Sequence, residues 1–189
     1  MYEQFLWLDR RFFYAFNHLP HSFLTDSFFL FFSVAGVYGA IWILLAFMLI
    51  KFDGMDNRKE LISIFIALML EIFAVEILLK NTFLRIRPET ALSDAVSIMS
   101  PMNSYSFPSG HATIAFASAY ILSMQRKKSA WIFYLLAILV AVSRVYLGRH
   151  YPSDVLYGAA IGYFIGVSAY ILGGKVFKSL PGINRARKK

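Results

Sequence analysis

The stretch Ser143-Arg144-Val145-Tyr146-Leu147-Gly148-Arg149-His150-Tyr151-Pro152-Ser153-Asp154 places a histidine, a carboxylate and two arginines between two strongly apolar segments. Charged groups at the border of a membrane are costly and are usually functional. Two other segments have the same character: Lys80 to Pro88 follows one apolar run, and Pro108-Ser109-Gly110-His111 opens another. The pattern predicts that the three segments meet in one charged site at a membrane surface.

The composition is typical of an integral membrane protein. Of the 189 residues, 58% are hydrophobic and 16% are charged, whereas soluble folds carry about 25% charged residues. The net charge of +8 is distributed in short clusters between apolar segments, as in the loops of membrane proteins, so no nucleic-acid partner is expected. Cysteine is absent, which excludes disulfides and thiolate metal sites.

The apolar segments predict five membrane spans, at about residues 28–50, 61–79, 109–124, 131–146 and 155–172. Residues 4–17 are aromatic but contain Asp9, Arg10 and Arg11, so they predict an amphipathic helix within an interfacial segment 1–24. Residues 81–108 contain three prolines and are predicted to be mostly loop. The prediction is a single all-α membrane domain over 1–189, a polytopic bundle of five to six helices, with the N-terminal segment as the sixth.

The basic residues predict the orientation. With five spans, the span ends that border the three charged segments all lie on one side of the membrane. Most lysines and arginines lie on the other side, in the loops 51–59 and 126–128 and in the basic tail 173–189. The positive-inside rule therefore predicts a cytoplasmic C-terminus and a site that faces the exterior.

The residues of the three segments suit a phosphate ester. Such a site needs cations and N–H donors for the oxygens, a nucleophile, and an acid for the leaving oxygen. The candidate phosphate-binding residues are Lys80, Arg87 and Arg144, together with Ser109 and Gly110 at the start of a predicted helix. The candidates for nucleophile and acid are His111 and His150, and Asp154 is placed to orient the imidazole of His150.

Taken together, Lys80-x6-Arg87-Pro88, Pro108-Ser109-Gly110-His111 and Ser143-Arg144-x5-His150-x3-Asp154 resemble the three-part signature of the type 2 phosphatidic acid phosphatase (PAP2) superfamily. The resemblance covers residues 80 to 154 and implies a PAP2-like helical core. It implies that His150 forms a phosphohistidine, that Asp154 orients His150, and that His111 protonates the leaving group. The phosphoryl oxygens would be bound by Lys80, Arg87, Ser109, Gly110 and Arg144, without a metal or another cofactor.

The resemblance implies a phosphatase of the bacterial inner (cytoplasmic) membrane that removes a terminal phosphate from a lipid phosphate or pyrophosphate. Undecaprenyl pyrophosphate is the first expected substrate. Phosphatidylglycerophosphate, phosphatidic acid and the lipid A 1-phosphate stay open, because the motifs recognise the phosphate and not the lipid. A transporter that uses Glu71 and Glu76, or a non-catalytic lipid-binding protein, are the alternatives from other classes. Membrane lipids are the expected partners, and the sequence does not predict the oligomeric state or the lipid entry path.

Four charged residues outside the motifs also require an interpretation. Glu76 and Lys80 are four residues apart on one predicted helix, so a structural ion pair is one interpretation. For Glu71, a structural role is favoured over a proton relay. Arg85 and Arg149 lie beside motif positions and are interpreted as solvated charges or headgroup contacts.

Overall fold

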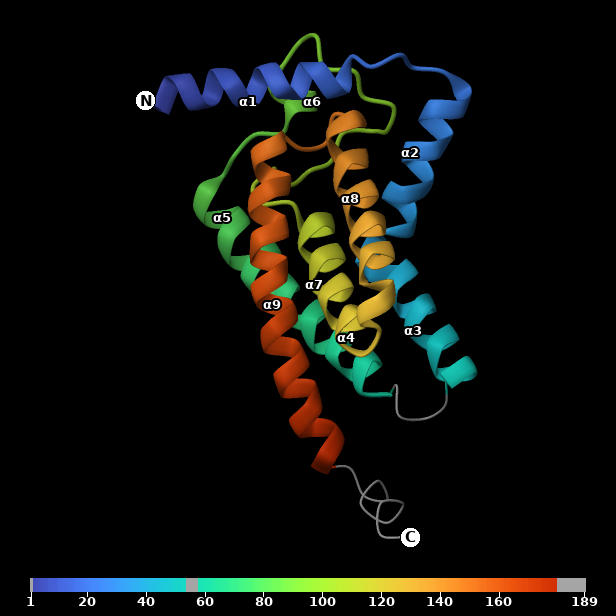
Figure 1. Cartoon of the computed structure of the whole chain (residues 1–189). Helices are drawn as coiled ribbons and strands as arrows, with labels where there is room; N and C mark the ends of the chain where they lie inside the picture. Colours follow the sequence, from blue (N-terminus) through green and yellow to red (C-terminus); the bar gives the residue numbers. More distant parts are fainter. Residues whose placement is uncertain (1, 54–57, 180–189) are drawn as a thin grey trace, which may run out of the picture.

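The computed structural model describes residues 2–53 and 58–179, and in these ranges it consists of helices and loops without a strand. Positions 180–189 of the predicted basic tail lie outside the described residues. The elements are α1 (Tyr2–Asn17), α2 (Phe23–Ala35), a 3₁₀ turn η1 (Val37–Gly39), α3 (Ala40–Asp53), α4 (Arg58–Glu71), a π-helix η3 (Ile72–Leu79), α5 (Lys80–Phe83), α6 (Pro88–Ala91), α7 (Gly110–Gln125), a 3₁₀ turn η4 (Lys127–Ser129), α8 (Ala130–Tyr146) and α9 (Pro152–Ser179) (Figure 1).

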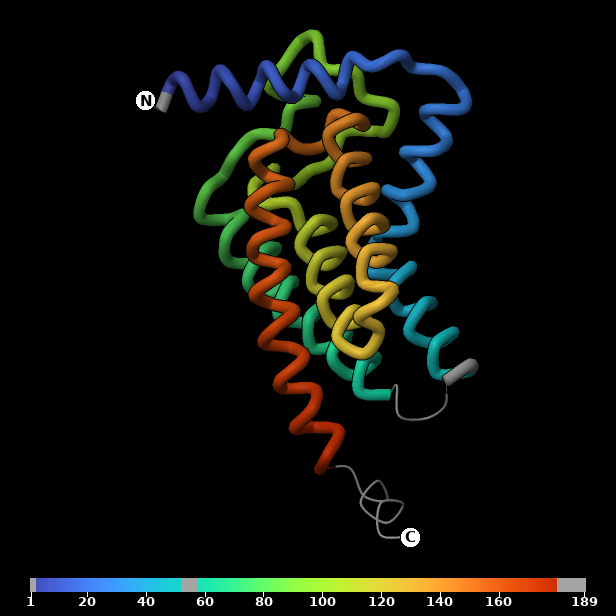
Figure 2. The backbone as a smooth tube through the Cα atoms, viewed as in Figure 1, coloured from blue at the N-terminus to red at the C-terminus, as the bar shows by residue number. Residues whose placement is uncertain are grey.

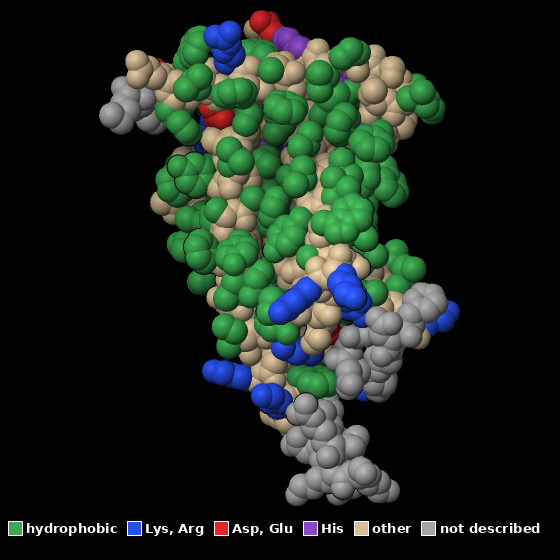
Figure 3. Space-filling view, in the orientation of Figure 1, with side chains coloured by type: hydrophobic (Ala, Val, Ile, Leu, Met, Phe, Trp, Pro, Cys, Tyr) green, Lys and Arg blue, Asp and Glu red, His purple; other side chains and the backbone are tan. Residues whose placement is uncertain are grey.

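The bundle has apolar side chains both inside and outside, which is the composition of a helix bundle in lipid. Helix α7 packs against α4, α8 and α9, and its buried residues Ile121 and Leu122 share a core with Trp42 and Val140. Large apolar side chains also cover the visible flank of the bundle (Figure 3). The prediction of an all-α membrane bundle is therefore confirmed.

Three helical segments of the described chain are long and apolar enough to cross a membrane: Arg58–Ala91, Lys127–Tyr146 and Pro152–Ser179. Helices α2 and α3 add a fourth crossing if the bent pair is one span. The predicted third span is α7, whose 16 residues rise about 24 Å, less than the roughly 30 Å of a hydrocarbon core. Its N-terminus begins below the upper ends of α8 and α9 (Figure 1), so the motif at its start is recessed into the bundle.

The predicted first span, residues 28–50, is broken in the structure. Helices α2 and α3 meet at an angle of 60°, because the chain takes a left-handed backbone conformation at Tyr38 (φ 47°) and Gly39 (φ 72°). The preceding Gly36 lies against α8, where an added Cβ would come within 2.8 Å of Val140 Cγ1. Hydropathy averages over this break, since glycine and tyrosine are tolerated in apolar segments.

Helix α9 contacts α7 through a face of glycines. A Cβ added at Gly158 would lie 2.6 Å from the carbonyl oxygen of Ser109, and one added at Gly166 would lie 2.8 Å from that of Ala117. Small residues at these positions let the two backbones approach closely. As a result the Ser109 amide donates a hydrogen bond of 3.0 Å to the Asp154 carbonyl, which fixes the second motif against the third.

Helix α1 lies across the upper end of the bundle (Figure 1). Asp9, Phe13 and Asn17 are buried at four-residue spacing on its inner face, whereas Trp7 and Phe12 are exposed. The connection from residue 84 to residue 109 winds over the same end of the bundle before it enters α7 (Figure 2). Asn17 Nδ2 on α1 donates to the carbonyl of Val96 in this connection at 2.8 Å.

Candidate active site

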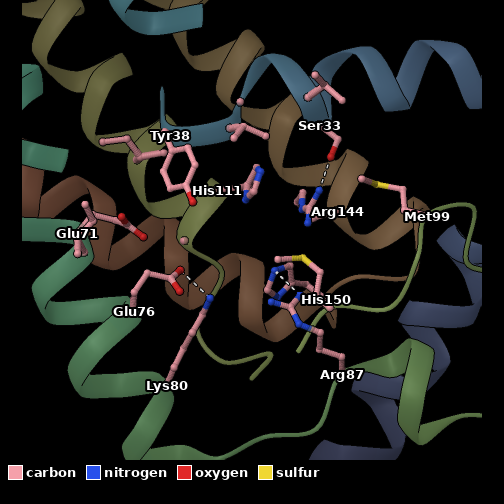
Figure 4. Close-up of a pocket in the computed structure, with 17 residues that line it drawn as sticks. Ser33, Tyr38, Glu71, Glu76, Lys80, Arg87, Met99, His111, Arg144 and His150 are labelled. Carbon is pink, nitrogen blue, oxygen red and sulfur yellow. Dashed lines mark hydrogen bonds and ion pairs between the residues drawn. The ribbon is translucent and has the colours of Figure 1, made fainter. Parts of the chain in front are cut away.

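One cavity of about 510 Å³ lies at the start of α7 (Figure 4). It is lined by six of the eight predicted site residues: Lys80, Arg87, Gly110, His111, Arg144 and His150. The remaining two, Ser109 and Asp154, lie directly behind this lining and are fully buried. Val34 of α2 and Met99 and Met102 of the long connection add an apolar wall. The cavity suits an anionic group that is attached to an apolar one.

His150 is held from one side and open to the cavity on the other. It lies in the turn between α8 and α9 and is 2% exposed. Its Nδ1 donates to the carbonyl oxygen of Ser106 at 2.7 Å, which leaves Nε2 as the unprotonated nitrogen. Nε2 accepts a hydrogen bond of 3.2 Å from Nη1 of Arg87, so a phosphate within reach of this nitrogen is also within reach of a guanidinium that can turn to its oxygens.

Asp154 supports His150 through an intermediate residue. The two side chains form no direct hydrogen bond, since Asp154 Oδ2 is 3.7 Å from His150 Nδ1. That oxygen instead accepts from Ser106 Oγ at 2.5 Å and from the Tyr151 amide at 2.9 Å. Ser106 therefore connects the carboxylate to the histidine. It lies outside the three motifs, so the sequence gives no signal of this role.

The electrostatic surroundings keep the His150 imidazole neutral. Burial, together with the positive charges of Arg87, Arg144 and Lys80, lowers the pKa of His150 well below its ordinary value, and the hydrogen bond to the Ser106 carbonyl opposes this only in part. A neutral imidazole has the lone pair that a nucleophile needs.

The N-terminus of α7 carries the second motif. Ser109 is the N-cap, and its side chain accepts a hydrogen bond from the Ala112 amide at 3.5 Å. A Cβ added at Gly110 would lie 2.5 Å from Glu71 Oε1 and 2.6 Å from Glu76 Oε1, so a larger residue at this position would displace both carboxylates. His111 follows in the first turn; its Nε2 is buried without a hydrogen-bond partner.

The three predicted cations are held to different extents. Arg87 donates through Nε and Nη2 to the carbonyl and hydroxyl oxygens of Ser104, both at 2.8 Å, and through Nη1 to the Arg149 carbonyl at 2.9 Å. Arg144 donates to the hydroxyl of Ser33 on α2, while its Nε is buried without a partner. Lys80 Nζ pairs with Glu76 Oε1 at 2.6 Å, which confirms the structural ion pair.

A π-helix brings two carboxylates to the cavity, a feature that hydropathy does not reveal. Within η3 each turn holds more residues than in an α-helix, so Glu71, Glu76 and Lys80 all line the cavity (Figure 4). In an α-helix the five-residue step from Glu71 to Glu76 would place their side chains on different faces. Single-turn π segments are frequent at functional sites.

The interpretation of Arg85 and Arg149 as solvated charges or headgroup contacts is wrong. The side chain of Arg149 is 1% exposed, and its Nη1 contacts both carboxylate oxygens of Glu89 at 2.7 and 2.6 Å. Arg85 bridges Asp154 at 2.5 Å and Asp9 at 2.6 Å. Their partners are 60 to 76 residues away in the chain, so sequence spacing gave no signal of these pairs.

Comparison with known proteins identifies the family. The sequence profile of the PAP2 superfamily matches residues 60–178. The chain is 32% identical over 126 residues to an undecaprenyl-diphosphatase of Sulfolobus acidocaldarius, covering 66% of this chain and 60% of that protein. It is 32% identical over 109 residues to a lipid A 1-phosphatase of Porphyromonas gingivalis, covering 56% of this chain and 22% of that protein. The matches thus span less than two thirds of these two relatives.

A solved structure resembles most of this chain. The crystal structure of Aquifex aeolicus LpxE superposes with a TM-score of 0.73 and 32% sequence identity, covering 86% of this chain and 94% of that one. The family profile covers more than half of the chain and includes all three motifs. The chain therefore belongs to the PAP2 superfamily.

Proposed function

We propose that this protein removes the terminal phosphate from a membrane lipid phosphate or pyrophosphate through a phosphohistidine on His150. The arrangement around His150 carries the proposal. Its Nε2 is directed at Arg87, its Nδ1 is bound by the Ser106 carbonyl, and its surroundings favour the neutral form. The relatives named above are lipid phosphatases by their descriptions.

In the first half of the proposed reaction, Nε2 of His150 attacks phosphorus and forms a P–N bond. The bond from phosphorus to the leaving oxygen breaks, and His111 donates a proton to that oxygen. The site residues proposed to bind the phosphoryl oxygens are Lys80, Arg87, Ser109, Gly110 and Arg144. Charge-assisted donors of this kind are strong ligands for phosphate.

In the second half, water attacks the phosphorus of the phosphohistidine and His111 accepts the proton of that water. The P–N bond breaks, inorganic phosphate leaves, and His150 returns to its neutral form. The proton that His111 gave to the leaving group is thereby replaced. Asp154 acts through Ser106, whose carbonyl holds Nδ1 and so keeps Nε2 directed at the phosphorus.

The proposed location is the bacterial inner membrane, with the cavity facing the periplasm or exterior. The end of the bundle remote from the cavity carries basic side chains (Figure 3). They are Lys51 of α3, Arg58 and Lys59 of α4, Lys127 and Lys128 of η4, and Lys175 and Lys178 of α9. This distribution supports a cytoplasmic C-terminus by the positive-inside rule. A reporter that is active only in the cytoplasm should give a signal when it is fused to the C-terminus. A signal only from a reporter that is active outside the cytoplasm would show the reverse orientation.

Undecaprenyl pyrophosphate is the first substrate that we propose, in line with the Sulfolobus relative and an outward site. A second candidate is a lipid A 1-phosphate, because the Porphyromonas relative is described as acting there. The similarity to LpxE extends over 94% of that chain. Phosphatidylglycerophosphate and phosphatidic acid are the two further substrates to be compared.

Phosphate release by the purified protein in detergent tests the proposal. The four lipids are compared in the presence of EDTA, with His150→Ala as the variant. Release that survives EDTA and is lost in the variant supports a histidine mechanism without a metal, and the preferred lipid identifies the substrate. Release that is unaffected by the substitution would rule out the proposed nucleophile. Release that EDTA abolishes would contradict the metal-independent step.

A further inference from the structure

A buried polar cluster behind His150 connects the cavity to the helix at its upper end. Asp154 is fully buried, and both of its carboxylate oxygens are occupied. Oδ1 accepts from Nη1 of Arg85 at 2.5 Å, and Oδ2 accepts from Ser106 Oγ at 2.5 Å and from the Tyr151 amide. The guanidinium of Arg85 also lies over the ring of Tyr151, 4.0 Å from its centre.

Arg85 holds Ser106 from two directions. Its side chain fixes the carboxylate to which the Ser106 hydroxyl donates, and its main-chain carbonyl accepts the Ser106 amide at 2.7 Å. The carbonyl of Ser106 in turn accepts Nδ1 of His150 at 2.7 Å. Arg85 therefore does not touch the cavity, but it fixes the residue that orients the nucleophile.

The second half of the Arg85 guanidinium is bound by helix α1. Nη2 donates to Asp9 Oδ2 at 2.6 Å. The Asp9 carboxylate also accepts the amide of Ser153 at 2.9 Å and its hydroxyl at 2.5 Å, at the start of α9. Asp9 is 5% exposed, and a buried carboxylate is stable only when such partners surround it. Both carboxylate oxygens of Asp9 therefore accept hydrogen bonds.

Helix α1 has two faces with different environments. Asp9 lies on the inner face with Phe13 and Asn17, whereas the aromatic residues Trp7, Phe12 and Phe16 are exposed on the remaining surface. An amphipathic helix with such an apolar surface suits the headgroup region of a membrane. The helix expected at the membrane surface therefore supplies one carboxylate to the support of the reacting histidine.

We propose that Arg85 and Asp9 are positioning residues for the phosphatase reaction, which hold His150 through Asp154 and Ser106 and make helix α1 part of the active site. The proposal rests on the proposed phosphatase function. It predicts that loss of either residue lowers kcat by about 10- to 100-fold, the size of effect seen when an outer partner that orients a metal-bound histidine is removed. KM should change little, because neither residue contacts the cavity.

The test compares Asp9→Asn, Arg85→Gln and Arg85→Lys with wild type on the lipid that wild type hydrolyses fastest. Matched controls are Glu3→Gln and Arg10→Gln, which remove an exposed charge of each sign from the same helix. We expect both controls to retain wild-type kcat. The kcat of Arg85→Lys should lie between those of wild type and Arg85→Gln, since lysine keeps the charge but cannot bind Asp154 and Asp9 through two separate nitrogens.

The pH profile adds a measurement that a general loss of packing would not change. Removing the Arg85 charge leaves Asp154 freer to stabilise a protonated His150, so the acidic limb of kcat/KM should move to higher pH in Arg85→Gln. Removing the Asp9 charge should move it in the opposite direction. If Arg85→Gln does not fold, Asp9→Asn carries the test alone, because it keeps the size of the side chain.

Vanadate binding separates failure of this inference from failure of the proposed function. Vanadate adopts the five-coordinate geometry of phosphoryl transfer, and its affinity does not depend on the lipid. Weaker vanadate binding in Asp9→Asn and Arg85→Gln than in the controls would support the positioning role even if none of the four lipids were hydrolysed. The positioning role would be overturned if Asp9→Asn and Arg85→Gln both kept the wild-type kcat, the wild-type acidic limb of kcat/KM and the wild-type vanadate affinity.

Discussion

His150 and His111 line the same cavity, yet they are held in different ways. His150 donates Nδ1 to the Ser106 carbonyl and contacts Arg87 at Nε2, whereas Nε2 of His111 is buried without a hydrogen-bond partner. Both ring nitrogens of His150 have protein partners before a substrate binds. His111 Nε2 has none, and the leaving oxygen of a bound substrate would supply one. The difference agrees with a preorganised nucleophile and an acid that waits for the leaving oxygen.

Removing the preorganised histidine should have the largest effect. His150→Ala is expected to lower kcat for phosphate release by about 10⁴-fold or more, because loss of a nucleophile removes the covalent route altogether. Steady-state rates on the best lipid, with an unchanged melting temperature as the control for folding, check this. If His150→Ala kept a tenth of the wild-type rate, His150 would not be the nucleophile, which is the role that distinguishes it from His111.

Substitution of the unpartnered histidine should cost less and depend on the leaving group. His111→Ala is expected to lower kcat by about 10²- to 10⁴-fold on a lipid phosphate, the usual contribution of general acid catalysis. On an aryl phosphate, whose leaving oxygen needs no proton, the loss in the phosphorylation step should be much smaller. Equal losses on both substrates in single-turnover experiments would contradict the acid role.

The lowered pKa of His150 predicts a pH dependence with a definite sign. The ordinary pKa of histidine is about 6.5, and burial with the nearby cations lowers that of His150 well below this value. The imidazole therefore stays neutral at neutral pH, and the acidic limb of kcat/KM due to His150 should lie below about pH 6.5. The unfolded chain binds more protons between the two pKa values, so the free energy of unfolding should decrease as the pH falls through this window.

Nuclear magnetic resonance of isotope-labelled histidine, with His150→Gln used to assign the signal, measures this pKa directly. A titration midpoint at or above about pH 6.5 would contradict the neutral nucleophile.

Removing the ion pair between Glu76 and Lys80 should have the smallest effect, and the substrate should then bind more tightly. Glu76 is 40% exposed in its side chain, so the pair is worth about 1 kcal/mol or less. Glu76→Gln releases Lys80 for phosphate and removes a negative charge from the cavity, and we expect KM to fall by about 2- to 5-fold. A rise in KM with loss of kcat would indicate instead that Glu76 contacts the substrate.

The helical bundle and the convergence of the three motifs were predictable from the sequence. Long apolar segments and prolines determine where helices and connections lie, and the parity of the spans places Lys80, His111 and His150 at the same end. The break of the first span was not predictable from hydropathy, because Tyr38 and Gly39 change the backbone direction without changing the apolar character.

The support behind the histidine was also not predictable. Ser106 lies in a loop without periodicity, and the bond from its carbonyl to His150 depends on main-chain geometry. Arg85 and Asp9 are 76 residues apart and become partners only when α1 folds across the bundle. The π-helix that directs Glu71 into the cavity gives no signal in residue type, since its sequence is as apolar as an α-helical span.

Isolation of the phosphorylated protein is the most direct test of the central claim. His111→Ala should slow hydrolysis of the intermediate, and an aryl phosphate needs no proton on its leaving oxygen, so brief reaction of this variant with a radiolabelled aryl phosphate and quenching in alkali should trap the label. We predict a phosphoryl group that is stable in base, labile in acid, and located on His150 by mass spectrometry. Turnover without any label on His150, or a label on another side chain, would contradict the account.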